Sequence, residues 1–437
     1  MASHQLITAV VIVLLIAGIS IPFWSLVGVG RAFRRHRPLA LGVDGVPDRT
    51  DVAILIAAHN EESVIAATLR SATQQVDAGQ IFIASDGSTD RTSAIARSFG
   101  ANVLDVEPNR GKAGALAAAI DHFALAERFE VVMLLDADTK LAHDYMETGL
   151  PLFAAPDVIA VAGTAATNPK PKAPGLLAQV LVAYRERVYI VFQYLQKFGQ
   201  AARYANVVPI VPGFASMYRS RVLSSIDITA KGLAIEDFNM TFEVHAKKLG
   251  RIEFRPGAAL AYTQDPATFA DYSKQVGRWS LGFWQTVKRH RFRPTRFWAS
   301  LSVSIVELVI GCLSFLLVVP AVVISSIASF TVDSGIDPGF GAVVSEALPV
   351  PVLVTGALVP DFLITIVAAV IARRPLFLLL GLVFPLVRFV DAALCLHRLG
   401  VALFSRSSGV WVSPARRAII EVLEEEALPV PAGSVVH

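Results

Sequence analysis

Three short polar clusters rich in carboxylates follow short apolar runs in the first part of the chain. They are HNEE at 59–62 after the run 52–57, SDGSTD at 85–90 after 81–84, and DADT at 136–139 after 131–135. Singly, an Asp after a strand is often only the N-cap of the next helix, and DGSTD is a good turn sequence. Acidic groups that converge on one edge of a sheet repel one another unless a cation lies between them. A divalent cation with a bound nucleotide diphosphate meets this need, because hard cations bind carboxylate and phosphate oxygens.

Two common nucleotide-binding signatures are missing. No G-x-G-x-x-G follows the first apolar run, and no G-x-x-x-x-G-K-[ST] occurs in the chain. These absences argue against a dinucleotide cofactor and against a P-loop. Lys112, in the sequence NRGK at 109–112, begins an expected helix and is placed to contact phosphate as a point charge.

A further polar group, QVGRW at 275–279, stands just before a long apolar stretch. Trp279 alone is typical of an anchor at the membrane interface. Gln275 and Arg278 lie about one helical turn apart beside it, and this pairing favours a ligand site instead. Sugars have an apolar face of C–H bonds on which an indole ring stacks, while Gln275 can bond a hydroxyl group. The sequence therefore predicts a sugar acceptor site here.

Strand-like and helix-like runs alternate between residue 51 and about residue 265. The expected strands are 52–57, 81–84, a strand near 103, and 131–135, and the expected helices are 61–76, 91–99 and 112–126. This alternation predicts a mostly parallel sheet covered by helices. Ligands of such sheets bind beyond the carboxyl ends of the strands, which is where the polar clusters stand.

Apolar segments account for the unusual composition. Of the 437 residues, 54% are hydrophobic and only 17% are charged, whereas soluble proteins carry about a quarter charged residues. The segments are 6–30, 299–330, 348–372 and 375–404, and each is long enough to cross a bilayer. The first is too long for a signal peptide, and no basic residue precedes it. The fourth contains Arg388, Asp391, His397 and Arg398, so a single crossing, a broken pair of short helices and an interfacial helix all stay open.

Basic residues flank the apolar segments at 31–37, 288–296 and 373–374, and the positive-inside rule places these flanks in the cytoplasm. We therefore expect a transmembrane helix at 1–30, a cytoplasmic domain at 31–296 with interfacial helices near 272–292, a transmembrane region of about three segments at 297–404, and a cytoplasmic tail at 405–437. The net charge is +3, but many of the basic residues lie at these flanks. The charge therefore gives no reason to expect a nucleic-acid partner. Both cysteines, Cys312 and Cys395, fall in apolar segments, so no structural disulfide is expected.

Together these motifs resemble the family 2 glycosyltransferases, and among them the membrane-integrated cellulose, chitin, hyaluronan and poly-N-acetylglucosamine synthases. The resemblance covers roughly 50–290 and the helices that follow. It rests on AAHNEE (57–62), SDGSTD (85–90), NRGKAGAL (109–116), DAD (136–138), PGFASMYR (212–219), IED (235–237) and QVGRW (275–279), in the order of the family. The resemblance implies an α/β fold of the GT-A type, which binds nucleotide sugars, inserted between transmembrane helices.

The resemblance also implies residue roles. Donor and nucleotide binding would fall to Ala58, His59, Glu61, Asp86, Lys112, Asp136 and Arg278. Asp136 and Asp138 would hold Mg²⁺ or Mn²⁺ with the diphosphate, and Asp237, beside Glu236, would be the general base. Gln275 and Trp279 would bind the acceptor sugar. The tail segment 408–417, with Trp411, resembles a segment that follows the last membrane helix in some of these synthases and would cover the donor site.

Three positions depart from the family pattern. Ala57 stands where Pro is common, Ser85 where the first Asp is common, and Ile235 where Thr usually precedes the acid pair. Recognition of uracil would then rest on Asp86 alone, because Ser85 carries no charge. The acid pair itself is retained.

The resemblance implies inverting transfer from a UDP-sugar to a growing β-linked polysaccharide that passes through a multi-pass protein of the plasma membrane. The resemblance alone favours UDP-N-acetylglucosamine over UDP-glucose as the donor. Transfer of a single sugar to a membrane lipid is the alternative. A transporter with a nucleotide-sensing domain is a third reading, although no inverted repeat is visible. The oligomeric state stays open.

Overall fold

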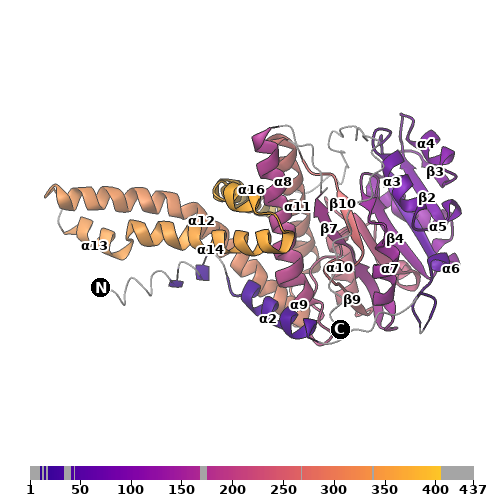
Figure 1. Cartoon of the computed structure of the whole chain (residues 1–437), viewed down its shortest axis with the longest axis horizontal. Coiled ribbons are helices and arrows are strands. Elements are labelled where there is room, and N and C mark those ends of the chain that lie inside the picture. Colours follow the sequence, from indigo (N-terminus) through magenta and orange to yellow (C-terminus); the bar gives the residue numbers. More distant parts are fainter. Residues whose placement is uncertain are drawn as a thin grey trace.

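The computed structural model describes residues 10–11, 14–15, 18–33, 41–43, 45–167, 175–266, 268–336 and 339–404. Expectations for Arg34, Arg35, Arg37 and the tail 405–437, including Trp411, lie outside the described residues. Figure 1 shows an α/β body, a layer of helices beside it, and a long helical arm that projects away from both.

A seven-stranded sheet forms the centre of the α/β body, in the order β3-β2-β1-β4-β8-β6-β9. Its strands are β1 (Val52–Ala58), β2 (Ile81–Asp86), β3 (Asn102–Val106), β4 (Val131–Asp136), β6 (Val158–Ala162), β8 (Ala215–Arg219) and β9 (Arg251–Glu253). Parallel pairing joins β3, β2, β1 and β4, whereas β8 is antiparallel to both β4 and β6. The predicted mostly parallel sheet and its four predicted strands are confirmed.

The helices that cover this sheet follow the predicted rhythm. They are α3 (Ile65–Thr73), α4 (Thr92–Ser98), α5 (Gly111–His122), α6 (Leu125–Arg128), α7 (Tyr145–Gly149) and α10 (Asp237–Ala246), with the short turns η1 (Arg49–Asp51), η2 (Ala78–Gln80), η3 (Leu150–Phe153) and η5 (Ser220–Ser225). A smaller sheet of β5 (Lys140–Leu141), β10 (Leu260–Thr263) and β7 (Thr164–Thr167), in that spatial order, lies next to the acidic turn after β4.

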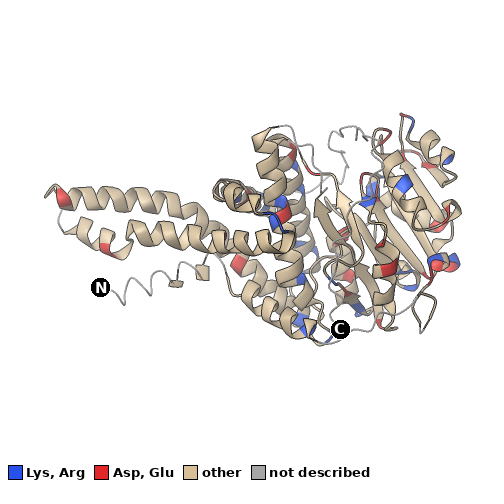
Figure 2. Cartoon of the chain, viewed as in Figure 1, with Lys and Arg blue, Asp and Glu red and all other residues tan. Residues whose placement is uncertain are grey.

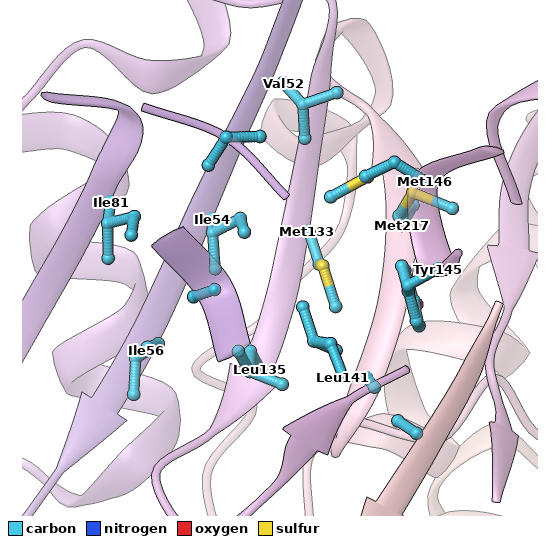
Figure 3. Packing of buried hydrophobic residues seen from close by; sticks show 14 of the residues in the cluster. Val52, Ile54, Ile56, Ile81, Met133, Leu135, Leu141, Tyr145, Met146 and Met217 are labelled. Atoms are coloured by element: carbon cyan, nitrogen blue, oxygen red, sulfur yellow. The ribbon is translucent and has the colours of Figure 1, made fainter. Parts of the chain in front are cut away.

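The central strands are buried on both faces. All seven residues of β1 are buried, as expected for a parallel strand with helices on either side. On one face, Ile54 and Ile56 lie in a cluster with Met133 of β4 and Tyr145 of α7 (Figure 3). Because neighbouring residues of a strand point to opposite faces, Leu55 belongs to a second cluster that includes residues of α5 and α10. Both cores hold the carboxyl ends of β1, β2 and β4 in fixed positions.

A layer of helices lies beside the body (Figure 1). It contains α2 (Ser20–Ala32), α8 (Leu176–Ile190), the π-helical turn η4 (Val191–Lys197), α9 (Phe198–Gln200), α11 (Phe269–His290), α15 (Leu376–Leu380) and α16 (Phe384–Phe404). α11 packs along α16, and α2 packs against η4 and α9. The segment expected to be interfacial, 272–292, falls almost entirely within α11, whose first turn is capped by the Thr268 side chain accepting from the Asp271 N–H at 3.1 Å.

The arm consists of α12 (Arg296–Asp333), α13 (Phe340–Ala347) and α14 (Val350–Ala372). Figure 2 shows few charged residues along it. Within the described residues, two stretches are long and apolar enough to cross a membrane, Arg296–Asp333 and Phe340–Ala372. The described part of the first predicted segment includes the 13-residue helix α2, and the fourth is broken into α15 and α16.

Buried ion pairs join the arm to the helical layer. Arg187 of α8 donates to Asp361 of α14 at 2.8 Å, and Arg388 of α16 donates to the other oxygen of the same carboxylate at 3.0 Å. Both Arg187 and Asp361 are buried. Removing one partner of a buried pair leaves an uncompensated charge, so this connection holds the two parts in register.

Close contact between α2 and α9 depends on Gly199. A Cβ atom at this position would lie 2.1 Å from the carbonyl oxygen of Trp24, a contact that forces the helices apart. We expect Gly199→Ala to lower the free energy of unfolding by about 1–3 kcal/mol, as overpacking does elsewhere. Thermal unfolding of the detergent-solubilised protein measures the change.

Gly30→Ala is the matched control, because Gly30 lies in α2 and a Cβ there meets nothing within 4 Å. Alanine favours helix over glycine, so this variant should unfold at the same or a slightly higher temperature. Equal destabilisation by both variants would contradict the assigned contact.

Candidate active site

The first two polar clusters lie at the carboxyl ends of β1 and β2. His59 Nδ1 lies 2.6 Å from the Asp86 carbonyl oxygen, and the Arg110 N–H donates to Asp86 Oδ1 at 2.7 Å. Ala58, Glu61 and Asp86 are buried. Among the described residues, Asp86 Oδ2 has no hydrogen-bond partner. This part of the sheet edge therefore keeps a buried carboxylate oxygen that a ligand N–H can satisfy.

Lys112 connects the third polar cluster to the acid pair of IED. Its Nζ lies 2.7 Å from Asp136 Oδ1 and 2.8 Å from Glu236 Oε1. Burial disfavours the charged amine, but the negative charges of Asp136 and Glu236 outweigh burial and raise the pKa of Lys112. Gly213 lies against this group: a Cβ there would be 3.2 Å from both Lys112 Nζ and Glu236 Oε1. The chain thus brings α5, β4 and the start of α10 together at one charged centre.

Asp237 begins α10 next to this centre. Its Oδ2 accepts from the Gly213 N–H at 3.2 Å, and its Oδ1 accepts from the Phe238 N–H at 2.8 Å. Burial, followed by the charge of Glu236, raises the pKa of Asp237 to about 6, although Lys112 and these N–H groups act in the opposite direction. A carboxylate with a pKa close to neutrality is suited to general-base chemistry.

Gln275, Arg278 and Trp279 lie on α11. They line the same cavity as Asp136, Asp138, Lys112, Glu236 and Asp237, and its volume is about 1290 Å³. Glu61 also borders this cavity, whereas Ala58, His59 and Asp86 are not among its lining residues. The cavity continues between α12 and α16, where Glu307, Arg388 and Asp391 line it. The predicted acidic residues and the predicted acceptor residues therefore share one space.

The loop that carries the acid pair is fixed directly on α11. A Cβ atom on Gly282 would lie 2.1 Å from Ile235 Cγ1, so Ile235 packs closely on the helix at this glycine. The Ala234 N–H donates to Gln285 Oε1 at 2.8 Å. Ile235, which departs from the family pattern, thus makes a packing contact. This contact sets the distance between the acid pair and the QVGRW motif.

Two charged residues of this region were missed by the sequence analysis. Arg185 of α8 donates to Gln275 Oε1, and its guanidinium carbon lies 4.6 Å from the centre of the Trp279 ring. Lys197 of η4 is buried in the cavity wall, and burial lowers its pKa to about 7, against the effect of the Asp237 charge. The signal was present: the charged sequence YRER at 184–187 and Lys197 interrupt an otherwise apolar helical stretch.

The carboxylates present fit a divalent cation that is also bound by phosphate. Asp136 and Asp138 both line the cavity, and Lys112 already places a cation against Asp136. Within the described part of the chain, no group of three or more His, Cys, Asp or Glu side chains could hold a metal ion. Two carboxylates suit Mg²⁺ or Mn²⁺ when substrate phosphates supply further oxygens.

The chain is similar to several known proteins. Residues 53–227 match the model of glycosyl transferase family 2. The chain is similar to the poly-β-1,6-N-acetyl-D-glucosamine synthase of Staphylococcus epidermidis, with 27% identity over 286 residues that cover 61% of this chain and 65% of the relative. The enzyme of the same name from Staphylococcus aureus strain COL is 25% identical over 264 residues, which cover 56% of this chain and 60% of the relative. The chain therefore spans less than two thirds of the length of these relatives.

Among solved structures, the chain is similar to glucosyl-3-phosphoglycerate synthase from Mycobacterium tuberculosis in complex with Mn²⁺, uridine diphosphate and glucosyl-3-phosphoglycerate. The identity is 17%, the TM-score is 0.37, and the match covers 60% of this chain and 88% of that one. The family match, together with the mostly parallel sheet, supports a GT-A-like fold. Residues 53–227 thus match family 2 of the glycosyltransferases, and this match supports a glycosyltransferase.

Proposed function

We propose that this chain is an inverting glycosyltransferase that extends a β-linked polysaccharide from a UDP-sugar and passes the product through the membrane. The observation that carries the proposal is the single cavity, in which Asp237 and the acidic cluster at one end are continuous with Trp279 and with α12 and α16 at the other. The relatives named poly-β-1,6-N-acetyl-D-glucosamine synthase favour UDP-N-acetylglucosamine as the donor.

Asp237 is the proposed general base. In an inverting transfer, the acceptor hydroxyl attacks the anomeric carbon while its proton moves to the base and the bond to the UDP oxygen breaks. Asp237 Oδ1 and Oδ2 each accept one backbone N–H, which fixes the carboxylate toward the cavity that holds Trp279. Its raised pKa keeps it basic enough to take the proton.

The leaving diphosphate needs positive charge. Lys112 and Arg278 both line the cavity, and the fork of Arg278 suits two phosphate oxygens. A divalent cation held by Asp136 and Asp138 would neutralise charge that develops on the diphosphate. We assign uridine binding to Ala58, His59, Glu61 and Asp86, supported by the unpartnered buried oxygen of Asp86 at this edge.

The acceptor sugar would stack on Trp279 and bond Gln275. The polar residues Glu307, Arg388 and Asp391 then border its way out between the arm and the helical layer. This path supports a multi-pass protein of the plasma membrane, with the α/β body in the cytoplasm and Arg296–Asp333 and Phe340–Ala372 as membrane spans. Polar side chains inside a membrane are costly and mark pathways for polar substrates.

Replacement of the base is the direct test of the site. In a radiolabel screen of UDP-sugars with membranes that carry the protein, Asp237→Asn should lower incorporation about 10²- to 10⁴-fold, the usual contribution of a general base. Asp121→Asn, at an exposed position of α5, makes the same chemical change and should keep the wild-type rate. Full incorporation by Asp237→Asn would remove Asp237 from the mechanism.

The pH profile gives a second test. Only deprotonated Asp237 accepts a proton, so kcat/KM should fall about tenfold per pH unit below the pKa of about 6. Glu236→Gln removes a negative charge that helps to raise this pKa, and the acid limb should move to lower pH. A profile that stays flat down to pH ~4.5 would be that of an Asp with an ordinary pKa and would contradict the assignment.

Product length separates the polysaccharide synthase from an enzyme that modifies a lipid. Wild-type protein incubated with labelled donor should give a ladder of oligosaccharides on a gel. The reason is that the cavity continues past Trp279 between α12 and α16, where further sugar units can follow the first. A single labelled species that extracts with lipid would favour transfer to a membrane lipid. Absence of UDP release with every donor would favour the transporter.

A further inference from the structure

A buried arginine contacts the acceptor motif from a helix outside that motif. Arg185 lies in α8, 90 positions before Gln275, and is buried. Its Nη1 donates to Gln275 Oε1, and its guanidinium carbon lies 4.6 Å from the centre of the Trp279 ring. Arg185 therefore touches two of the three side chains that mark the motif.

The remaining contacts of Arg185 hold its guanidinium in place. Nε donates to the Tyr189 hydroxyl at 2.7 Å and lies 3.3 Å from Asp265 Oδ1. Asp265 is itself nearly inaccessible, with 6% of its side chain exposed, and supplies the opposite charge. A planar guanidinium with several fixed partners has one orientation, which a flexible ammonium group would not have.

This arrangement determines what Gln275 offers to the cavity. A glutamine amide has one acceptor oxygen and one donor NH₂ group. Because Oε1 accepts from Arg185, the amide is held with Nε2 as the group left to donate. Gln275 lines the cavity, so it presents an N–H donor to a hydroxyl oxygen of the acceptor.

The same contact leaves one face of Trp279 for a sugar. An indole ring has two faces, and the guanidinium of Arg185 covers one of them. Arg185 and Trp279 both line the cavity, and the guanidinium packed on one face of the ring limits its rotation. Buried ion pairs add little net stability, and replacing them with apolar side chains is often neutral or stabilising. A buried Arg185–Asp265 pair at this place therefore points to positioning rather than to stability.

We propose that Arg185 is a positioning residue of the acceptor site, which fixes the Gln275 amide and one face of Trp279 for binding of the acceptor sugar. This inference rests on the proposed function, because it concerns the acceptor of that reaction. Arg185 acts through its two neighbours and takes no part in the chemical step at the anomeric carbon.

The matched control is Arg187, two positions further along α8. It is equally buried, but it contacts Asp361 and Thr365 of α14 and no residue of QVGRW. Residues two apart on a helix face different directions, so Arg187→Met removes a buried arginine from the same helix without touching the acceptor motif.

Steady-state kinetics with a soluble oligosaccharide acceptor test the inference. Arg185→Met should raise the acceptor KM about tenfold and leave the donor KM within about twofold, which is the pattern of lost acceptor binding. Arg185→Lys should give an acceptor KM between those of the wild type and Arg185→Met, because lysine keeps the positive charge but lacks the planar guanidinium. Arg187→Met should not change the acceptor KM selectively. A loss by Arg185→Met that affects kcat and both KM values equally would indicate a structural role and overturn the inference.

A mutant cycle in which Gln275 and Trp279 are replaced together shows whether Arg185 acts through these neighbours. In a background that carries both Gln275→Ala and Trp279→Ala, Arg185→Met should change the acceptor KM by less than about twofold, because nothing remains for it to position. A further tenfold rise in that background would mean that Arg185 contacts the acceptor directly, and would overturn the positioning role.

A spectroscopic measurement is independent of the reaction. The guanidinium lies on the Trp279 ring, so Arg185→Met should change the intrinsic fluorescence of the protein, and the same change should vanish in a Trp279→Phe background. If wild-type protein releases no UDP but this fluorescence change is present, the proposed function fails and the contact stands. If UDP release is normal and the change is absent, the inference fails alone.

Discussion

The ion pairs of Lys112 are the interaction on which the site depends. They join α5, the carboxyl end of β4 and the start of α10, which are separated by long stretches of sequence. Asp136, Asp138, Glu236 and Asp237 border one cavity, and without a cation among them their charges would repel one another. Lys112 supplies that cation when no ligand is bound. A diphosphate and its metal ion would then exchange partners with an existing cluster instead of building a new one.

The sequence predicted those parts of the structure that have a local pattern. Apolar runs bounded by polar clusters gave the strands β1, β2, β3 and β4, because a buried parallel strand is apolar throughout. The convergence of the polar clusters followed from the rule that parallel strands end at one edge. The place of QVGRW in the same cavity rested on family resemblance, since nothing local relates α11 to the sheet.

Features that join distant parts of the chain could not be predicted. The antiparallel strand β8 enters the sheet between β4 and β6, and its apolar residues do not reveal its direction. Arg185 and Asp361 find their partners 90 and 174 positions away, respectively, and neither pairing has a signature in one sequence. For the fourth apolar segment, a broken pair of helices was one of three open alternatives, and the contacts of α15 with α8 and of α16 with α8 and α11 had no signature in the sequence.

Helix α8 connects the two functions assigned to the molecule. Arg185 contacts the proposed acceptor motif QVGRW, and Arg187 is held by Asp361 in the arm. Arg388 shares that carboxylate, so one anion serves two cations from different helices. A buried ion pair tolerates little displacement, because separating the two charges leaves each of them unpaired in an apolar environment. The helix is therefore a rigid connection between the QVGRW motif and the arm.

The contact of Ile235 with Gly282 has a consequence for protein engineering. Since the isoleucine fills the space that a glycine leaves on α11, the acid-pair loop and α11 should be exchanged together as one unit. A chimera that takes α11 from a homologue with a larger residue at position 282 would collide with Ile235. Donor segments for grafting should therefore be chosen as matched pairs that span both positions.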